Sequence, residues 1–495
     1  MILSRRTVVL GMGAFAVSLC HGGPARTEGA SLNPLDSGAT TILRLERRSI
    51  EVNGKPASVF GIRQPDGTFG VRTDVGARFR VRVENRIDVP SLIHWHGMTP
   101  PWRQDGVPGV SGPPIPAGGS ADYDFPLTFG GTFWMHSHQG LQEQLMMAAP
   151  LIIRDERDRP TQQEVVVMLA DFSFRPPDEI VAALKRGAGM AMSGATAGAK
   201  PGRGMGDMAG TGAARMAKGS KAAPPDLNDV TYDAFLANDR TLADPEVVKV
   251  EPGERVRLRI INSSSMSAYH IDLGALQGEL TAVDGFAVRP VKGRRFPIAV
   301  AQRLEISVRI RRKSGAWPVL AILEGERRQT GIVLVTSGGA VARLPELAAT
   351  TSPPLTLALE ARLRAMRPLV PRKPDRVHTL ALTGSMMGYR WSLNNVAWTP
   401  DVPPLPLAEG ERVELVLVNQ TPMPHPMHLH GHEYQVVEID GKRFAGAVRD
   451  TVLVPPGRRV VVAFDANNPG LWAFHCHLLY HLEAGMFTTF RYGTI

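Results

Sequence analysis

A ten-residue segment that occurs three times constrains the fold of this chain more than any other feature of the sequence. The copies are residues 76–85 (GARFRVRVEN), 253–262 (GERVRLRIIN) and 410–419 (GERVELVLVN). In each copy the apolar residues alternate along the run and an asparagine ends it, which is typical of a half-buried β-strand. The copies begin 177 and 157 residues apart, so we expect three successive β domains.

A second element also recurs, downstream of the first. Its clear copies are residues 131–138 (GTFWMHSH) and 470–477 (GLWAFHCH), and residues 315–322 (GAWPVLAI) are a weaker match. The outer copies contain His-x-His where the middle copy has Leu-x-Ile. We therefore predict an all-β chain of three β-sandwich domains, in which the first and third carry the chemistry and the second is a spacer.

The remaining sequence suggests where these domains begin and end. Residues 1–25 combine Arg5 and Arg6 with an apolar run too short to cross a bilayer, which predicts a twin-arginine signal peptide and a periplasmic or secreted protein. Residues 186–220 have no valine, isoleucine, leucine or aromatic residue, so we interpret them as an insertion that cannot build a core. The expected domains are residues 40–158, 163–340 and 377–495, with a proline-rich linker over residues 341–376.

Composition excludes several classes of protein. The net charge of +9 is spread without a long basic block, so we expect no nucleic-acid partner. Beyond the N-terminus no apolar run reaches membrane length, so we expect no stable membrane insertion. The two cysteines, Cys20 and Cys476, are too few for a disulfide framework or a cysteine-rich zinc or iron–sulfur site. The oligomeric state is left open.

Histidine is the informative residue, because eleven of the fourteen histidines fall in four short clusters. Residues i and i+2 of a strand face the same side, so each His-x-His directs two imidazoles at one place. Eight converging imidazoles favour copper and are too many for one ion, which predicts a trinuclear copper cluster between the first and third domains. The eight are His94, His96, His136, His138, His428, His430, His475 and His477.

Cys476 separates two of these histidines and therefore points to the opposite face of its strand. There it can join His425 and His481 in a Cys/His₂ set, with Met486 as a long axial thioether, which describes a blue-copper electron-transfer site. The first domain has no cysteine or histidine at the matching positions, so we expect one blue copper. Those positions hold Ser137, Gln142 and Met147.

With these four motifs in order, the chain resembles the three-domain multicopper oxidases of the laccase and copper-resistance group. The resemblance implies three cupredoxin-like Greek-key β-sandwich domains, four coppers per chain, and four one-electron oxidations coupled to reduction of dioxygen to two waters. It makes His94 and His428 type 2 ligands, and His425, Cys476, His481 and Met486 the type 1 set. The implied type 3 ligands are His96, His136, His138, His430, His475 and His477.

Proton delivery has one candidate in the sequence. Asp105 follows the first histidine motif and resembles an acidic residue that the family places near the cluster, so it is a candidate proton donor; a solvated turn aspartate is the alternative. Some family members have glutamate directly after the last type 1 histidine, whereas this chain has Leu482. Glu483, one residue further along a strand, would face the other way.

The electron donor is the most open question. Thioethers favour Cu(I), so methionines in residues 186–220 suggest a cuprous oxidase for copper resistance with laccase-like side activity, although their presence in a linker could be incidental. The alternatives are a laccase acting on phenols or aromatic amines and a copper-sequestering binding protein; a copper nitrite reductase fits less well. These methionines are Met190, Met192, Met205, Met208 and Met216.

Overall fold

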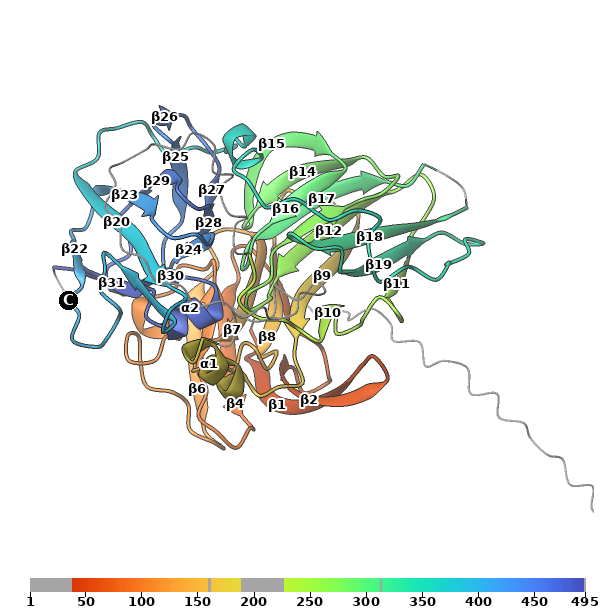
Figure 1. The fold of residues 1–495 in the computed structure, drawn as a ribbon, viewed down its shortest axis with the longest axis horizontal. Coiled ribbons are helices and arrows are strands. Elements are labelled where there is room, and N and C mark those ends of the chain that lie inside the picture. Colours follow the sequence, from red (N-terminus) through yellow and green to blue (C-terminus); the bar gives the residue numbers. More distant parts are fainter. Residues whose placement is uncertain (1–37, 159–161, 188–226, 312–313, 494–495) are drawn as a thin grey trace, which may run out of the picture.

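A computed structural model describes residues 38–158, 162–187, 227–311 and 314–493 (Figure 1). The predicted signal peptide and all but the first two residues of the predicted insertion lie outside these ranges. Strands dominate the described residues and form six sheets, which pack as three successive β-sandwiches. None of the helices found there is both long and apolar enough to cross a membrane.

The first sandwich pairs the sheet β2-β1-β4-β6 with the sheet β3-β8-β7-β5. Apolar side chains from both sheets form one core between them. Its elements are β1 (Thr41–Val52), β2 (Lys55–Arg63), β3 (Val71–Asp74), β4 (Arg78–Asn85), β5 (Ile93–His96), the 3₁₀ turn η1 (Trp102–Gln104), β6 (Ser120–Pro126), β7 (Gly131–Ser137) and β8 (Ala148–Arg154).

The second sandwich pairs the sheet β10-β9-β12-β17-β14-β15 with the sheet β11-β19-β18-β13-β16. Its elements are β9 (Gln163–Phe172), α1 (Pro177–Lys185), β10 (Ala234–Ala237), β11 (Val247–Lys249), β12 (Arg255–Asn262), β13 (Tyr269–Asp272), β14 (Gly278–Val283), β15 (Phe286–Gly293), β16 (Arg295–Ile298), β17 (Arg303–Arg309), β18 (Ala316–Leu323) and β19 (Gln329–Val335).

The third sandwich pairs the sheet β21-β20-β23-β29-β25-β26, to which β27 is attached, with the sheet β22-β31-β30-β24-β28. The 3₁₀ turn η3 (Glu360–Arg362) precedes it. Its elements are β20 (Arg376–Ser385), β21 (Arg390–Leu393), β22 (Leu405–Leu407), β23 (Arg412–Asn419), β24 (His425–Leu429), β25 (Tyr434–Ile439), β26 (Lys442–Arg443), β27 (Val448–Arg449), β28 (Thr451–Val454), β29 (Arg459–Asp465), β30 (Leu471–Cys476), α2 (Leu479–Glu483) and β31 (Phe487–Tyr492).

The repeated segment forms the same strand in each sandwich. Strands β4, β12 and β23 each run parallel to the first strand of their unit, which is β1, β9 and β20 respectively. The closing asparagine then anchors the next turn: Asn85 donates to the carbonyl of Val89 (2.9 Å), and Asn419 donates to that of Met423 (2.6 Å). These turns lead into β5 and β24, so the repeat positions the two strands that begin the histidine motifs.

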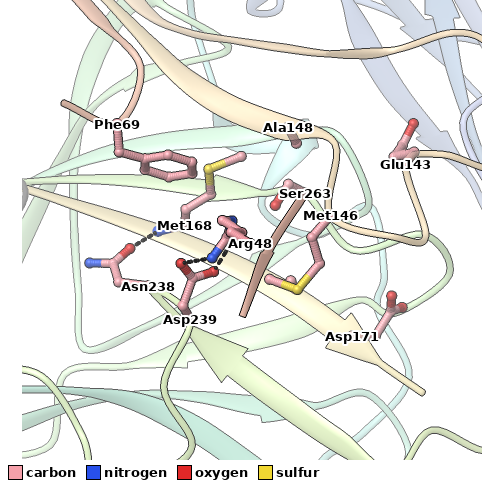
Figure 2. Close-up of a pocket in the computed structure, with 11 residues that line it drawn as sticks. Arg48, Phe69, Glu143, Met146, Ala148, Met168, Asp171, Asn238, Asp239 and Ser263 are labelled. Carbon is pink, nitrogen blue, oxygen red and sulfur yellow. Dashed lines mark hydrogen bonds and ion pairs between the residues drawn. The ribbon is translucent and has the colours of Figure 1, made fainter. Parts of the chain in front are cut away.

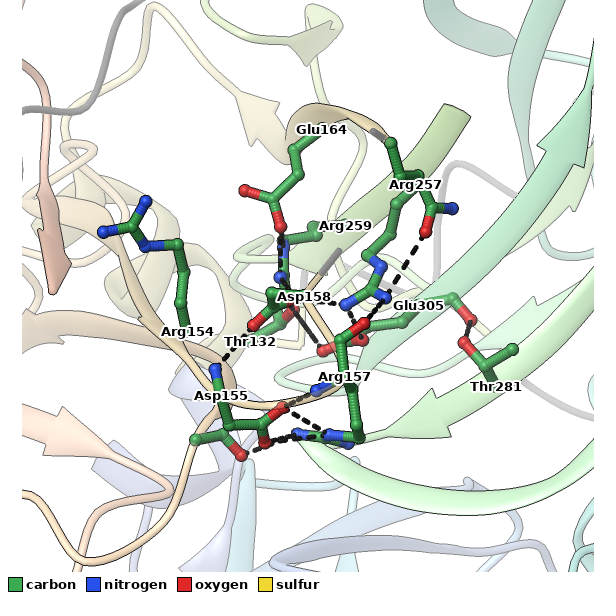
Figure 3. A network of polar contacts seen from close by, with 12 residues as sticks. Thr132, Arg154, Asp155, Arg157, Asp158, Glu164, Arg257, Arg259, Thr281 and Glu305 are labelled. Atoms are coloured by element: carbon green, nitrogen blue, oxygen red, sulfur yellow. Dashed lines mark hydrogen bonds and ion pairs between the residues drawn. The ribbon is translucent and has the colours of Figure 1, made fainter. Parts of the chain in front are cut away.

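The second sandwich joins its two neighbours in different ways. A single apolar cluster runs through the second and third sandwiches. Toward the first sandwich, a buried polar network forms around Arg259, whose guanidinium donates to Thr132 of β7 and to Glu305 of β17, both at 2.9 Å (Figure 3). Buried charges must be paired in this way to be tolerated, so the network fixes how the two sandwiches meet.

Candidate metal centre

The four His-x-His motifs come from two pairs of neighbouring strands. In the first sandwich β5 pairs with β7, which sets His94 opposite His136, and in the third sandwich β24 pairs with β30, which sets His428 opposite His475. The two strand pairs face each other across the junction of these sandwiches. His94 Nε2 lies 3.4 Å from His428 Nε2, and His138 Nε2 lies 3.3 Å from His475 Nε2.

The eight predicted imidazoles gather into three groups, each of which takes histidines from both sandwiches. Within a group the potential ligand atoms all lie within 4.8 Å of one another. The groups are His94, His96 and His428; His96, His136 and His477; and His138, His430 and His475.

Six of these eight imidazoles have one ring nitrogen in contact with a group outside the eight histidines. Backbone carbonyls face Nδ1 of three of them: the Asp105 carbonyl faces His94, the Asp450 carbonyl faces His428 and the Cys476 carbonyl faces His475, each at 2.9 Å. Such contacts fix the tautomer and turn the other nitrogen inward, as in metal-binding histidines.

Carboxylates contact three more imidazoles, and only one of these contacts joins residues that are close in sequence. Asp105 Oδ2 lies 2.8 Å from His430 Nδ1, and Asp450 Oδ1 lies 3.0 Å from His96 Nε2. Glu143 Oε2 lies 2.8 Å from His136 Nδ1. No sequence pattern pointed to Glu143 or Asp450.

The inward nitrogens provide a test of whether a metal fits. His96 Nδ1, His136 Nε2 and His477 Nε2 belong to one group, are buried, and have no hydrogen-bond partner among the described residues. Buried polar atoms are almost always partnered, so three unsatisfied lone-pair donors pointing to one place indicate a metal ligand set. An all-imidazole set of this kind suits copper.

The protonation state of these histidines agrees with metal binding. Burial, reinforced by neighbouring imidazoles, lowers the pKa of most of them well below the ordinary value. For His475 burial lowers the pKa to about 4. These seven imidazoles are therefore neutral at pH 7, which is the state that binds a metal ion.

A separate group lies on the other face of β30. Cys476 Sγ is 3.5 Å from His425 Nδ1 and 3.8 Å from His481 Nδ1, and all three side chains are fully buried. Met486 is buried beside them, since its amide donates to the carbonyl of His481 (2.9 Å) and its carbonyl accepts from the amide of Cys476 (3.1 Å). Burial raises the pKa of the Cys476 thiol, so a metal bound there must displace its proton.

The ring nitrogens of His425 and His481 that do not face Cys476 also have hydrogen-bond partners. Thr421 Oγ1 lies 2.7 Å from His425 Nε2, and Asp229 Oδ2 lies 2.9 Å from His481 Nε2. The Trp391 ring stacks on the His481 ring at 3.9 Å, and the Tyr389 hydroxyl donates to Asp229 at 2.6 Å. Asp229 belongs to the second sandwich, and no sequence pattern pointed to it.

At the matching place in the first sandwich, three polar side chains hydrogen-bond to one another. The hydroxyls of Ser91 and Ser137 both donate to Gln142 Oε1, at 2.7 and 2.8 Å. Ser91 precedes His94 by the same three positions that separate His425 from His428, so this spacing in the sequence could have identified Ser91 as the counterpart of His425. This place has hydroxyl and amide groups where the third sandwich has a thiol and imidazoles.

Asp105 is fully buried, which excludes the solvated turn as its environment. Its carboxylate contacts Nδ1 of both His430 and His94, at 2.8 and 3.1 Å. The segment that carries His481 is helix α2, so the strand alternation assumed for Glu483 does not apply there.

The expectation that the second sandwich is only a spacer is wrong. Besides Asp229, it supplies Arg303, whose guanidinium donates to both carboxylate oxygens of Asp450, one of them at 2.8 Å. Asp450 in turn contacts His96. The middle sandwich therefore supports the histidine groups although none of their members comes from its described residues.

Comparisons with known proteins agree with this geometry. Family models described as multicopper oxidase match residues 46–158, 164–338 and 371–494. The chain is 31% identical to multicopper oxidase MmcO of Mycobacterium tuberculosis over 85% of this chain and 81% of that protein. It is 28% identical to copper resistance protein A of Escherichia coli over 92% and 91%, and 26% identical to laccase-1 of Cryptococcus neoformans over 84% and 74%.

Solved structures show the same fold. Fet3p, a multicopper oxidase that functions in iron import, superposes with a TM-score of 0.73 at 20% identity, over 91% of this chain and 90% of that one. A laccase from Botrytis aclada superposes with a TM-score of 0.72 at 21% identity, over 91% and 88%. With the sheets described above, these matches confirm the predicted all-β fold of three cupredoxin-like sandwiches.

Proposed function

The chain belongs to the multicopper oxidase family, and we propose that within this family it is an exported cuprous oxidase that serves copper resistance, with laccase-like side activity. The family makes it an oxidoreductase that uses dioxygen and depends on copper. The number of coppers, the donor and the location of the protein are our proposals. The twin-arginine pattern of residues 1–25 supports export to the periplasm or the medium.

We propose four copper sites per chain. Cys476, His425 and His481, with Met486 as axial ligand, would hold type 1 copper, and His94 and His428 would hold type 2. The remaining six paired histidines would hold the type 3 pair. Copper at these sites supplies the one-electron chemistry that couples oxidation of a donor to reduction of dioxygen to water. The unsatisfied inward nitrogens and the neutral imidazoles support this assignment.

The protein has two tasks around these sites. Consecutive residues His475, Cys476 and His477 contribute to both the blue-copper set and the histidine groups, so one short covalent segment joins them. Reduction of dioxygen to two waters also needs four protons. Asp105 is the proposed proton donor, because its buried carboxylate lies between His94 and His430.

The donor assignment depends on one observation, which is the position of Asp229. Its carboxylate covers Nε2 of His481, while Trp391 covers the face of the same ring, and both covering side chains are buried. A bulky phenol therefore finds neither an open edge nor an open face of this imidazole to contact. A buried carboxylate whose Oδ1 lacks a hydrogen-bond partner among the described residues favours a small cation instead.

Methionines supply further support for Cu(I). Met387 lies in the turn between β20 and β21, two residues before Tyr389, and is 80% exposed. The methionine-bearing part of residues 186–220 lies outside the described residues, and described structure resumes at residue 227, close to Asp229. We propose that these thioethers collect Cu(I) and pass it toward Asp229.

The test is oxygen uptake by the copper-loaded protein with Cu(I) and with a simple phenol as donors. Our proposal predicts a higher kcat/KM for Cu(I), and a lower one after deletion of residues 186–220. Turnover with the phenol but little with Cu(I) would make the protein a laccase. Copper tolerance that survives Cys476→Ser in cells would favour sequestration over oxidation.

A further inference from the structure

A cavity lies where the first sandwich meets the second (Figure 2). Its volume of about 20 Å³ exceeds the roughly 10–15 Å³ that one water-sized molecule requires. Much of its wall is apolar and comes from both sandwiches. The apolar wall residues are Phe69, Met146, Ala148, Met168 and Ala170.

The polar groups along the cavity almost all have a hydrogen-bond or ion-pair partner already. Arg48 and Asp239 form a bidentate ion pair (Figure 2), with contacts of 2.6 and 2.9 Å. The Asn238 side chain accepts from the amide of Met168 at 2.7 Å. Asp171 accepts from the backbone amides of residues 265–267 and from the Ser267 hydroxyl. The wall thus offers few free groups to a polar ligand.

Glu143 is the exception, and it stands between the cavity and the histidine groups. It lines the cavity, while its Oε2 lies 2.8 Å from His136 Nδ1 and its Oε1 lies 3.9 Å from His477 Nδ1. Oε1 is buried without a hydrogen-bond partner among the described residues. The wall residue Ala148 is also the cross-strand partner of His136. One side chain therefore separates the cavity from two of the proposed type 3 ligands.

We infer that this cavity is a route by which dioxygen reaches the histidine groups from the junction of the first and second sandwiches. Dioxygen is small and apolar, so it gains from a wall of thioether, methyl and aromatic groups and needs no hydrogen-bond donor. The inference rests on the proposed reduction of dioxygen at the histidine groups, and is independent of which donor supplies the electrons.

The first test uses xenon, an apolar probe, on crystals of the metal-free protein. We expect xenon to bind among Met146, Ala148 and Met168 in the wild type and to be absent from Ala170→Phe, in which the new ring fills the cavity. Val166→Phe is the matched control, because Val166 lies on the same strand and is half-buried but does not line the cavity. Absence of xenon from the wild-type cavity overturns the inference.

The second test measures the KM for dioxygen of the copper-loaded variants at saturating donor. For Ala170→Phe we expect a rise of about threefold or more, with kcat and the kcat/KM for the donor unchanged, and for Val166→Phe no change. An unchanged KM in an Ala170→Phe protein that has lost xenon overturns the inference. If Ala170→Phe does not fold, Ala170→Leu replaces it. Absence of oxygen uptake by the wild type with every donor would instead refute the proposed function, and the xenon result would still stand.

Discussion

Replacing Asp229 by asparagine tests the proposed donor site most specifically. Asparagine keeps the size of the side chain and an oxygen that can accept from Tyr389 and His481, so the fold should persist. It removes the negative charge. Hydrogen bonds to charged groups contribute about 1.5–3 kcal/mol and those between neutral groups about 0.5–1.5 kcal/mol, so the change weakens the site by about 1–2 kcal/mol. We expect kcat/KM for Cu(I) to fall about 5- to 30-fold.

Oxygen uptake with Cu(I) and with a phenol gives the result, and the blue absorption shows that Cys476, His425 and His481 still bind copper. Asp233→Asn is the control, because Asp233 lies four residues further on and is exposed. It should leave both activities unchanged. An unchanged kcat/KM for Cu(I) in Asp229→Asn, or an equal fall with the phenol, would refute our assignment of the carboxylate to a cationic donor.

Three further predictions concern the metal sites and the fold. Cys476→Ser should lose the blue absorption and turnover while still binding copper at the paired histidines, as absorption spectra and metal analysis would show; a blue, active variant contradicts the assignment. Burial lowers the pKa of His475 and of His432 from 6.5 to about 4. In the metal-free protein the free energy of unfolding is therefore highest above about pH 6.5 and falls as the pH drops toward 4, because at each of these histidines the unfolded chain then binds a proton that the folded chain does not. Between pH 6.5 and 4.5 each should cost about 2–3 kcal/mol, which urea unfolding would measure, and stability that rises on acidification would disprove this. Arg303→Met leaves Asp450 buried without its guanidinium and should destabilise the metal-free protein by about 3–5 kcal/mol, whereas an unchanged Tm would show that the pair is not needed.

The sequence was sufficient for the sandwiches and for the histidine groups because both are encoded locally. Alternation along residues 76–85 and its two copies predicts β4, β12 and β23, and a His-x-His on a strand directs two imidazoles to one side. The threefold repeat then indicated which sandwiches would hold these motifs. Local patterns of this kind need no knowledge of which strands become neighbours.

The groups that hold the histidines from outside could not be predicted in the same way. Asp229 and His481 are 252 positions apart, and His96 and Asp450 are 354 apart. Nothing in the residues around Asp229 or Arg303 distinguishes them from ordinary surface charges. They reach the histidine groups only because the second sandwich packs against the other two. The sequence of the second sandwich lacks the His-x-His pattern, which is why it suggested a spacer.

Helix α2 shows a second limit of local patterns. A continued strand was assumed beyond His477, but residues from Leu479 turn into a short helix that returns His481 to Cys476. The chain therefore places the third member of the Cys/His₂ set by a helical turn rather than by strand alternation.

We propose that this chain couples the oxidation of Cu(I) to the complete reduction of dioxygen. The most direct measurement is the stoichiometry of Cu(I) and oxygen consumed by the copper-loaded protein, together with a peroxide assay, after subtraction of the rate seen with Cys476→Ser. We expect four Cu(I) oxidised per dioxygen and no peroxide. Two Cu(I) per dioxygen with accumulation of peroxide, or a rate no higher than that of Cys476→Ser, would contradict it.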